Sequence, residues 1–150
     1  METEYKKSAI VLVFNQSGQM LLQLRSKNDD KFPSHWDLAV GGGIDEGEES
    51  EVAARREMQE EIGVSPKIQA VAQLHCSYPA WKPGVTRETD LWIYRTTFNG
   101  PFSPDPNEVD KVEFFSLDEV KEMVAGEEKI HPELSILWRE GIVTQAAEIS

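Results

Sequence analysis

Residues 42–64 read GGIDEGEESEVAARREMQEEIGV, and the second half of this stretch decides the fold. Ser50 can serve as an N-cap, the alanines that follow favour helix, and Gly63 suits a left-handed C-terminal cap. We therefore predict a helix over residues 50–62.

Three glutamates share one face of this predicted helix. Glu57, Glu60 and Glu61 are spaced i, i+3 and i+4, so at about 3.6 residues per turn they project together. An apolar stripe roughly 100° away would dock the helix on a sheet. That stripe consists of Ala54, Met58 and Ile62. Like charges this close repel one another, and bound cations would remove the penalty. Carboxylates without His or Cys favour Mg²⁺, with Mn²⁺ as a substitute.

Taken alone, the triplet is also typical of a solvated acidic helix face. The chain carries 27 acidic and 15 basic residues, for a formal net charge of -12. A wider pattern decides between the two interpretations. It is Gly, five residues, Glu, seven residues, then Arg-Glu-apolar-x-Glu-Glu-x-Gly-apolar. The sequence matches it at Gly42, Glu48, Arg56, Glu57, Met58, Glu60, Glu61, Gly63 and Val64.

This pattern resembles the signature of the Nudix hydrolases, and the resemblance extends from about residue 8 to residue 124. It implies a Nudix-type α/β/α sandwich with a mixed β-sheet. It also implies hydrolysis of a phosphoanhydride bond in a nucleoside diphosphate-linked, or related diphosphate, small molecule, by water that Mg²⁺ activates.

The resemblance assigns roles to residues of the pattern. Glu57, Glu60 and Glu61 would bind metal, and the carbonyl of Gly41 is a further candidate ligand. Glu48 would pair with Arg56 and so hold the loop before the helix in place. We expect catalysis to depend on the metal ligands and on this pair.

The residue that accepts the proton stays open, because members of the family take this base from the pattern itself or from a loop elsewhere. Glu61 is one candidate. Glu108, in the loop 104–110, lies where the resemblance places an additional metal-binding or base carboxylate. Glu88 and Asp90 are further options.

Substrate contacts are less sharply indicated. Arg25 and Lys31 could meet phosphate charge, although exposed basic residues are usually only solvated. Trp36 and Trp81 could stack on a base, although a Trp beside a strand more often packs against the core. His75 stands in a predicted strand, where a structural role is more common than a catalytic one.

The rest of the chain predicts a mixed sheet and two further helices. We expect a hairpin of 8–14 with 20–24, strands over 36–40, 68–76, 91–98 and 112–115, and helices over 117–124 and 132–139. No repeat or linker divides the chain, so we expect a single Nudix domain over 1–150.

Charge and composition exclude several classes of protein. A net charge of -12 disfavours nucleic acid as a partner. Cys76 is the single cysteine, so no internal disulfide is expected and a reducing cytoplasm fits. The apolar run 9–14 is too short for a signal peptide or membrane span. Family analogy suggests a homodimer.

Two alternatives stay open. Residues 36–43 and 88–90 are similar to parts of type 1 isopentenyl diphosphate isomerases, which share the Nudix fold. Those enzymes need a cysteine in the strand leading to the pattern, where this chain has Gly41. The other alternative is a non-catalytic Nudix ligand-binding module, but such regulators usually carry a fused DNA-binding domain. The pattern does not choose among nucleoside triphosphates, nucleotide sugars, ADP-ribose and dinucleoside polyphosphates.

Overall fold

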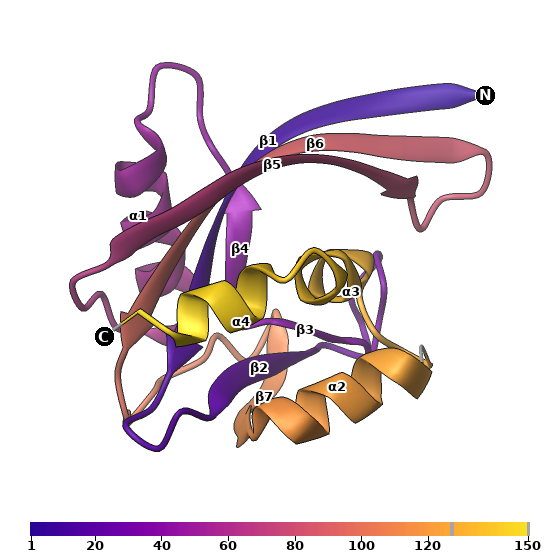
Figure 1. Cartoon of the computed structure of the whole chain (residues 1–150). Coiled ribbons are helices and arrows are strands. Elements are labelled where there is room, and N and C mark those ends of the chain that lie inside the picture. The colour runs from indigo at the N-terminus through magenta and orange to yellow at the C-terminus, as the bar shows by residue number, and fades with distance from the viewer. Residues whose placement is uncertain (127, 150) are drawn as a thin grey trace.

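The computed structural model describes residues 1–126 and 128–149. In chain order its elements are β1 (Glu2–Phe14), β2 (Met20–Arg25), β3 (Trp36–Leu38), β4 (Val40–Gly43), α1 (Ser50–Ile62), β5 (Gln69–Pro79), β6 (Val85–Thr97), β7 (Val109–Phe115), α2 (Leu117–Gly126), α3 (Pro132–Arg139) and α4 (Ile142–Ala147). Helix α1 lies on one side of a mixed sheet, and α2, α3 and α4 lie on the other (Figure 1).

Strand β1 is the centre of the sheet. It pairs in parallel with β6 along its whole length and antiparallel with β4 from Ser8 to Val11. Its side chains alternate between the two faces, as they must in a strand. Ala9, Val11 and Val13 pack toward α1, while Ile10, Leu12 and Phe14 pack toward the other helices. Burial on both faces explains the uninterrupted apolar run in the sequence.

The expected hairpin of 8–14 with 20–24 is wrong beyond its turn. Strands β1 and β2 pair only where Phe14 faces Met20. Beyond that point β2 pairs with β3 and β7 instead, because β4 and β6 occupy the two edges of β1. The turn itself forms as expected, with the Asn15 side chain accepting hydrogen bonds from the backbone of Ser17 and Gln19.

Three local expectations also need correction. The strand expected over 36–40 is divided into β3 and β4, and β4 continues through the glycines because their backbone pairs with β1. Ser50 is not the N-cap of α1. Glu49 holds that position without a side-chain hydrogen bond, and the Ser50 hydroxyl lies 2.6 Å from the hydroxyl of Tyr94. Helix α4 was not predicted, because its six residues are too few for a clear periodic signal.

The polar first half of β1 continues as a three-stranded extension with the adjoining ends of β5 and β6 (Figure 1). We call this the arm, and it comprises residues 2–7, 75–79 and 85–90. Its strands are longer than the apolar pattern indicates, because backbone pairing carries them past the core. In the described residues, no helix is long and apolar enough to cross a bilayer.

Candidate active site

Helix α1 brings its glutamates against strand β4. The carboxylate of Glu57 lies directly over Gly42, where a Cβ atom would overlap it. Gly42 is therefore required for this close approach and not for an unusual backbone angle. Gly63 ends the helix in the left-handed conformation, at φ 74°, as the sequence predicts.

Arg56 connects the loop before α1 to the acidic face of the helix. Its Nε and Nη2 donate to the two carboxylate oxygens of Glu48 at 3.0 and 2.8 Å. Nη2 also donates to the carbonyl of Gly43 at 3.0 Å, and Nη1 donates to Glu57 at 2.9 Å. The expected Glu48–Arg56 pair is thus present. It lowers the pKa of Glu48 to about 2.

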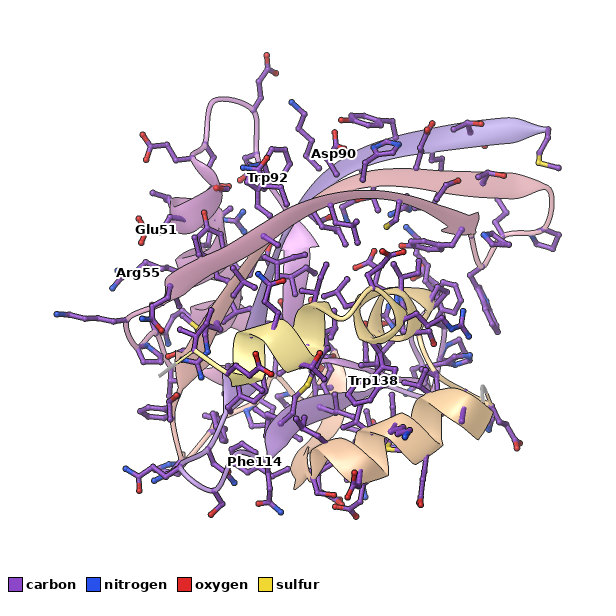
Figure 2. All side chains as sticks on the ribbon, in the orientation of Figure 1. Glu51, Arg55, Asp90, Trp92, Phe114 and Trp138 are labelled. Atoms are coloured by element: carbon purple, nitrogen blue, oxygen red, sulfur yellow. The ribbon has the colours of Figure 1, made fainter. Side chains whose placement is uncertain are left out.

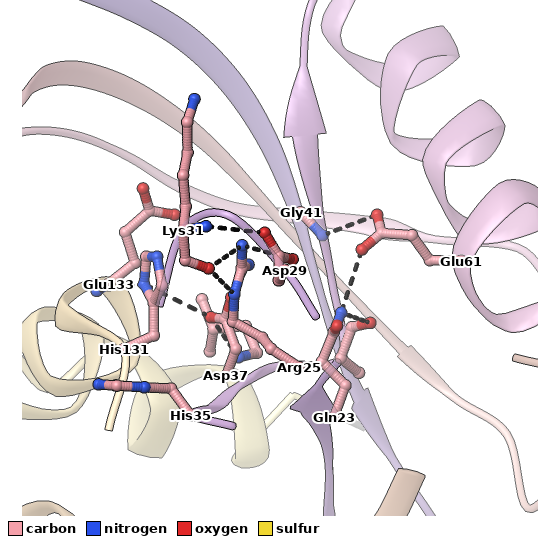
Figure 3. Close-up of polar contacts among 12 residues, drawn as sticks. Gln23, Arg25, Asp29, Lys31, His35, Asp37, Gly41, Glu61, His131 and Glu133 are labelled. Carbon is pink, nitrogen blue, oxygen red and sulfur yellow. Dashed lines mark hydrogen bonds and ion pairs between the residues drawn. The ribbon is translucent and has the colours of Figure 1, made fainter. Parts of the chain in front are cut away.

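Glu61 is buried, with 8% of its surface exposed. Gln23 donates to its Oε1 at 3.1 Å, and the backbone N–H of Gly41 donates to its Oε2 at 3.2 Å (Figure 3). Burial raises the pKa of Glu61 well above its usual range, and the neighbouring charge of Glu57 raises it further. The structure therefore directs the N–H of Gly41 at this site, and the role of its carbonyl as a metal ligand stays a prediction.

The glutamates share a helix face but do not converge in this conformation. Within residues 1–126 and 128–149, no three or more His, Cys, Asp or Glu side chains lie close enough to hold a metal ion. The reason is that Arg56 engages Glu57 at 2.9 Å and Glu60 at 3.5 Å, while Glu61 contacts Gln23.

The donor set nevertheless fits a hard divalent cation. It consists of carboxylates alone, which suit Mg²⁺ and Mn²⁺. Glu61 is desolvated and in hydrogen-bond contact with the Glu57 carboxyl group, and it also accepts hydrogen bonds from Gln23 and the N–H of Gly41. A cation here would allow both carboxyl groups to ionise.

Glu108 lies near the acidic face of α1, as expected for an additional carboxylate. Burial and the charges of Asp105, Glu57 and Glu60 raise its pKa. Its backbone carbonyl accepts from the N–H of Ser26 at 3.1 Å, which fixes this part of the loop.

The other two base candidates lie elsewhere. Asp90 and Glu88 contact the ring of His75 at 2.6 and 3.0 Å on the exposed face of the arm. They alternate along β6 with Arg87, which lines a cavity on the opposite face. The structure therefore gives Glu88 and Asp90 no contact with the site, and His75 has the surface role that its strand position predicts.

A cavity of about 360 Å³ lies under the arm and reaches Gly41 and Gly42. The Glu57 carboxylate lies against Gly42, so the acidic helix adjoins the cavity at strand β4, although no α1 side chain is part of the described lining. The described lining holds five basic side chains, from Lys6, Arg25, Lys31, Lys82 and Arg87, against four acidic ones, from Glu4, Asp30, Asp37 and Glu133. In a chain of net charge -12, this lining carries one more basic than acidic side chain.

Two of these cations come from the arm and were not predicted. Lys6 is partly desolvated, and burial followed by the nearby charge of Arg87 lowers its pKa. Arg87 pairs with Glu4 at 3.1 Å, and its buried Nε lacks a partner among the described residues. Crowded, desolvated cations of this kind suit an anionic ligand.

Arg25 lines the cavity, but its guanidinium is already bound by groups of the protein. It pairs with Asp29 at 3.0 Å and Asp37 at 3.1 Å, and it donates twice to the carbonyl of Lys31 (Figure 3). These contacts fold the loop after β2. Lys31 lines the cavity itself, so of the two predicted phosphate contacts Lys31 is the better placed.

The two predicted tryptophans lie in different surroundings. Trp36 is not part of the cavity lining; its ring packs edge-on against Phe115 at 5.1 Å, and the Lys111 ammonium lies 5.5 Å from its centre. Trp81 lines the cavity and is 46% exposed. Stacking on a ligand is thus open to Trp81 and not to Trp36.

An aromatic wall that the sequence did not reveal surrounds Trp81. We use this name for Phe32, Tyr78, Trp81 and His131, which all line the cavity. Ring centres are 5.1 Å apart for Phe32 and Trp81, 4.7 Å for Phe32 and His131, and 6.0 Å for Tyr78 and His131. The rings come from three segments, around residues 32, 78–81 and 131, so no single local motif could have grouped them.

Fold and site together define an α/β protein in which a carboxylate-bearing helix packs beside a cavity lined by basic, acidic and aromatic side chains. The family model described as the NUDIX domain matches residues 4–134, which is most of the chain. The chain belongs to the Nudix family.

Two relatives indicate how far the likeness extends. A Nudix hydrolase of Listeria monocytogenes, itself called uncharacterized, is 46% identical over 54 residues, or 36% of this chain and 32% of that protein. Dihydroneopterin triphosphate diphosphatase of Escherichia coli is 29% identical over 102 residues, or 59% of this chain and 65% of that protein. The matched stretches thus span about a third of the first relative and just under two thirds of the second.

A solved structure confirms the architecture. The MutT protein from Methanosarcina mazei superposes with a TM-score of 0.76 at 18% identity, covering 99% of each chain. At this level of identity the likeness concerns the fold. The expected α/β/α sandwich with a mixed sheet is confirmed.

Proposed function

We propose that the protein is a Mg²⁺-dependent hydrolase that cleaves a phosphoanhydride bond in a small diphosphate-linked molecule, with Mn²⁺ as a substitute cation. One observation carries this proposal. A desolvated carboxyl group, Glu61, lies beside Glu57, and both contact the β4 glycines that also line a cavity with five basic side chains. Carboxylates for cations and cations for phosphate are thereby brought together in one place.

Different residues of the site would have different roles in this reaction. Glu57, Glu60 and Glu61 would hold the cation, which when bound offsets phosphate charge and acidifies water. Gln23 and the N–H of Gly41 orient Glu61. Lys6 and Lys31 would bind the phosphate chain from the cavity wall.

The Arg56 guanidinium holds both Glu48 and Glu57, so it fixes the loop and the helix as one unit.

A proton released during hydrolysis needs an acceptor whose pKa lies near the working pH. Burial and nearby carboxylates raise the pKa of Glu108, which supports it as that acceptor, and Glu61 remains the other candidate.

The relatives support the reaction class. The name of the Escherichia coli relative describes diphosphatase action on a triphosphate. An isomerase is less well supported, because Gly41 stands where that chemistry needs a cysteine. Cys76 does not supply it, since its thiol is not part of the described cavity lining and burial raises its pKa to about 11.

The test is a panel of diphosphate compounds assayed for Mg²⁺-dependent release of phosphate or nucleoside monophosphate. Glu61→Gln should lower kcat by about 100-fold or more, because the helix loses a cation ligand, while the thermal midpoint stays close to that of the unaltered protein. Glu51→Gln is the matched control, since Glu51 projects from the outer face of α1 beside Arg55 (Figure 2). Retained activity in Glu61→Gln would contradict the proposal, and ligand binding without any turnover would indicate a non-catalytic module.

A further inference from the structure

The rings of the aromatic wall face the cavity, and other protein atoms cover only part of their surface. Trp81 is the most exposed of these four rings, at 46%. Its neighbour Phe32 lies between Trp81 and His131, with ring centres 5.1 and 4.7 Å away. A large exposed aromatic ring in a concave site indicates that a flat apolar group packs there.

The loop that carries Phe32 adopts an unusual backbone to place this ring. Phe32 and Ser34 have φ values of 48° and 57°, in the left-handed region that bulky residues rarely enter. His35 supports the bend, because its Nδ1 lies 2.8 Å from the carbonyl of Pro33. Backbone strain of this kind is concentrated at functional sites, where the surrounding structure enforces it.

Glu133 adds a hydrogen-bond acceptor beside the wall. It lies in the first turn of α3 and lines the cavity. The Tyr78 hydroxyl donates to its Oε2 at 2.5 Å, and in the described residues its Oε1 has no hydrogen-bond partner. The neighbouring Asp37, in contrast, is occupied by Arg25 and by the backbone N–H of Leu38. Glu133 is thus the acceptor that a ligand can reach.

The cavity lining therefore combines two kinds of polar group. Basic side chains such as Lys6 and Lys31 favour an anion, whereas Glu133 favours N–H donors and lies near enough to Lys6 for its charge to act on that ammonium. A ligand that satisfies both kinds of group carries phosphate and a flat, N–H-donating ring. A volume of about 360 Å³ is sufficient for such a molecule.

We propose that this cavity binds a ring with a 2-amino-4-oxopyrimidine edge, as found in guanine and pterins, stacked on Trp81 beside the tilted ring of Phe32, with its N–H edge donating to Glu133. That edge presents two adjacent donors, the ring N–H and the amino group, which match one carboxylate. Adenine presents a donor beside an acceptor, and the acceptor would face the carboxylate lone pairs. The proposal names the substrate class of the hydrolase proposed above and rests on that function only for the cleavage step.

A binding measurement with compounds that cannot be cleaved tests the ring preference separately from the proposed hydrolase function. Calorimetry in metal-free buffer with GMP, IMP and AMP, which contain no phosphoanhydride, should give tightest binding for GMP. We expect GMP to bind at least about tenfold tighter than AMP, with IMP between them because it lacks the amino group. Guanosine and neopterin, compared in parallel, then identify whether the purine or the pterin ring is preferred.

Two variants assign the contacts. Glu133→Gln should reduce the preference for GMP over AMP to within about threefold, because it loses the charged acceptor. Glu140→Gln, at the other end of α3 and exposed, is the matched control and should keep the preference. Trp81→Ala should weaken GMP and AMP alike by roughly tenfold, and Trp81→Phe should restore most of the loss. Trp81 is exposed, so these two variants test the stacking even if Glu133→Gln folds poorly.

Equal binding of GMP and AMP by the unaltered protein would overturn the inference, as would an unchanged preference in folded Glu133→Gln. Unchanged affinities in Trp81→Ala would equally overturn it. If the base preference appears but no diphosphate compound is cleaved with Mg²⁺, the proposed hydrolase function fails while this inference stands. If cleavage occurs without base preference, the reverse holds.

Discussion

At the scale of single residues, the site depends on the missing side chain of Gly42 as well as on the glutamates of α1. Gly42 has no side chain where the Glu57 carboxylate lies. In Gly42→Ala the added methyl would displace that carboxylate or the strand beneath it. We expect unfolding free energy to fall by about 1–3 kcal/mol and Mg²⁺-dependent activity to be largely lost.

Urea unfolding and the diphosphate assay measure these two effects. Gly126→Ala is the control, since a Cβ atom at residue 126 meets nothing within 4 Å. Activity in Gly42→Ala equal to that of the control would show that Glu57 does not need its observed position.

Cys76 provides a test of burial at the same scale. Its thiol is half-buried, and its pKa is raised to about 11 by burial and by nearby carboxylates. At about pH 8 the thiolate fraction should be roughly 100-fold or more below that of an ordinary cysteine. Alkylation by iodoacetamide, followed by mass spectrometry, should be correspondingly slow in the folded protein and fast in guanidinium chloride. Equal rates in both states would contradict this placement.

At the scale of elements, the loop before α1 and the helix are held together by the Glu48–Arg56 pair. The pKa of Glu48 is lowered from 4.5 to about 2, so its contribution to stability is present above about pH 4.5. It is lost as the pH falls toward about 2. The difference in thermal midpoint between the unaltered protein and Glu48→Gln should therefore shrink over this interval. A difference independent of pH would indicate that charge is not involved.

The sequence predicted elements best where local signals agree. Helix α1 has the predicted bounds of 50–62, because helix-favouring alanines, an apolar stripe and Gly63 all point to the same ends. The arm was underestimated because residues 2–7 are polar and carry no apolar pattern. Their pairing with β6 is a tertiary contact between segments about 80 residues apart, which no local rule encodes.

At the scale of the whole molecule, the candidate site shows the same division. Its acidic helix and the Glu48–Arg56 pair were predicted, because their spacing lies within a single stretch of sequence. The cavity was not, because Lys6, Phe32, Trp81 and Glu133 come from four segments that only the fold brings together. The predicted contacts from Arg25 and Trp36 were chosen by residue type, and the structure places the first in a brace and the second in packing.

The proposed hydrolysis requires divalent cations to bind at the glutamate face of α1, beside the glycines of β4. The most direct measurement is anomalous X-ray scattering from crystals of the protein grown with Mn²⁺. We predict a peak bounded by Glu57, Glu60 and Glu61 near Gly42, with Arg56 no longer holding Glu57 and Glu60 together. No manganese peak there, with Glu61 still held by Gln23 and Gly41 at millimolar Mn²⁺, would contradict the account.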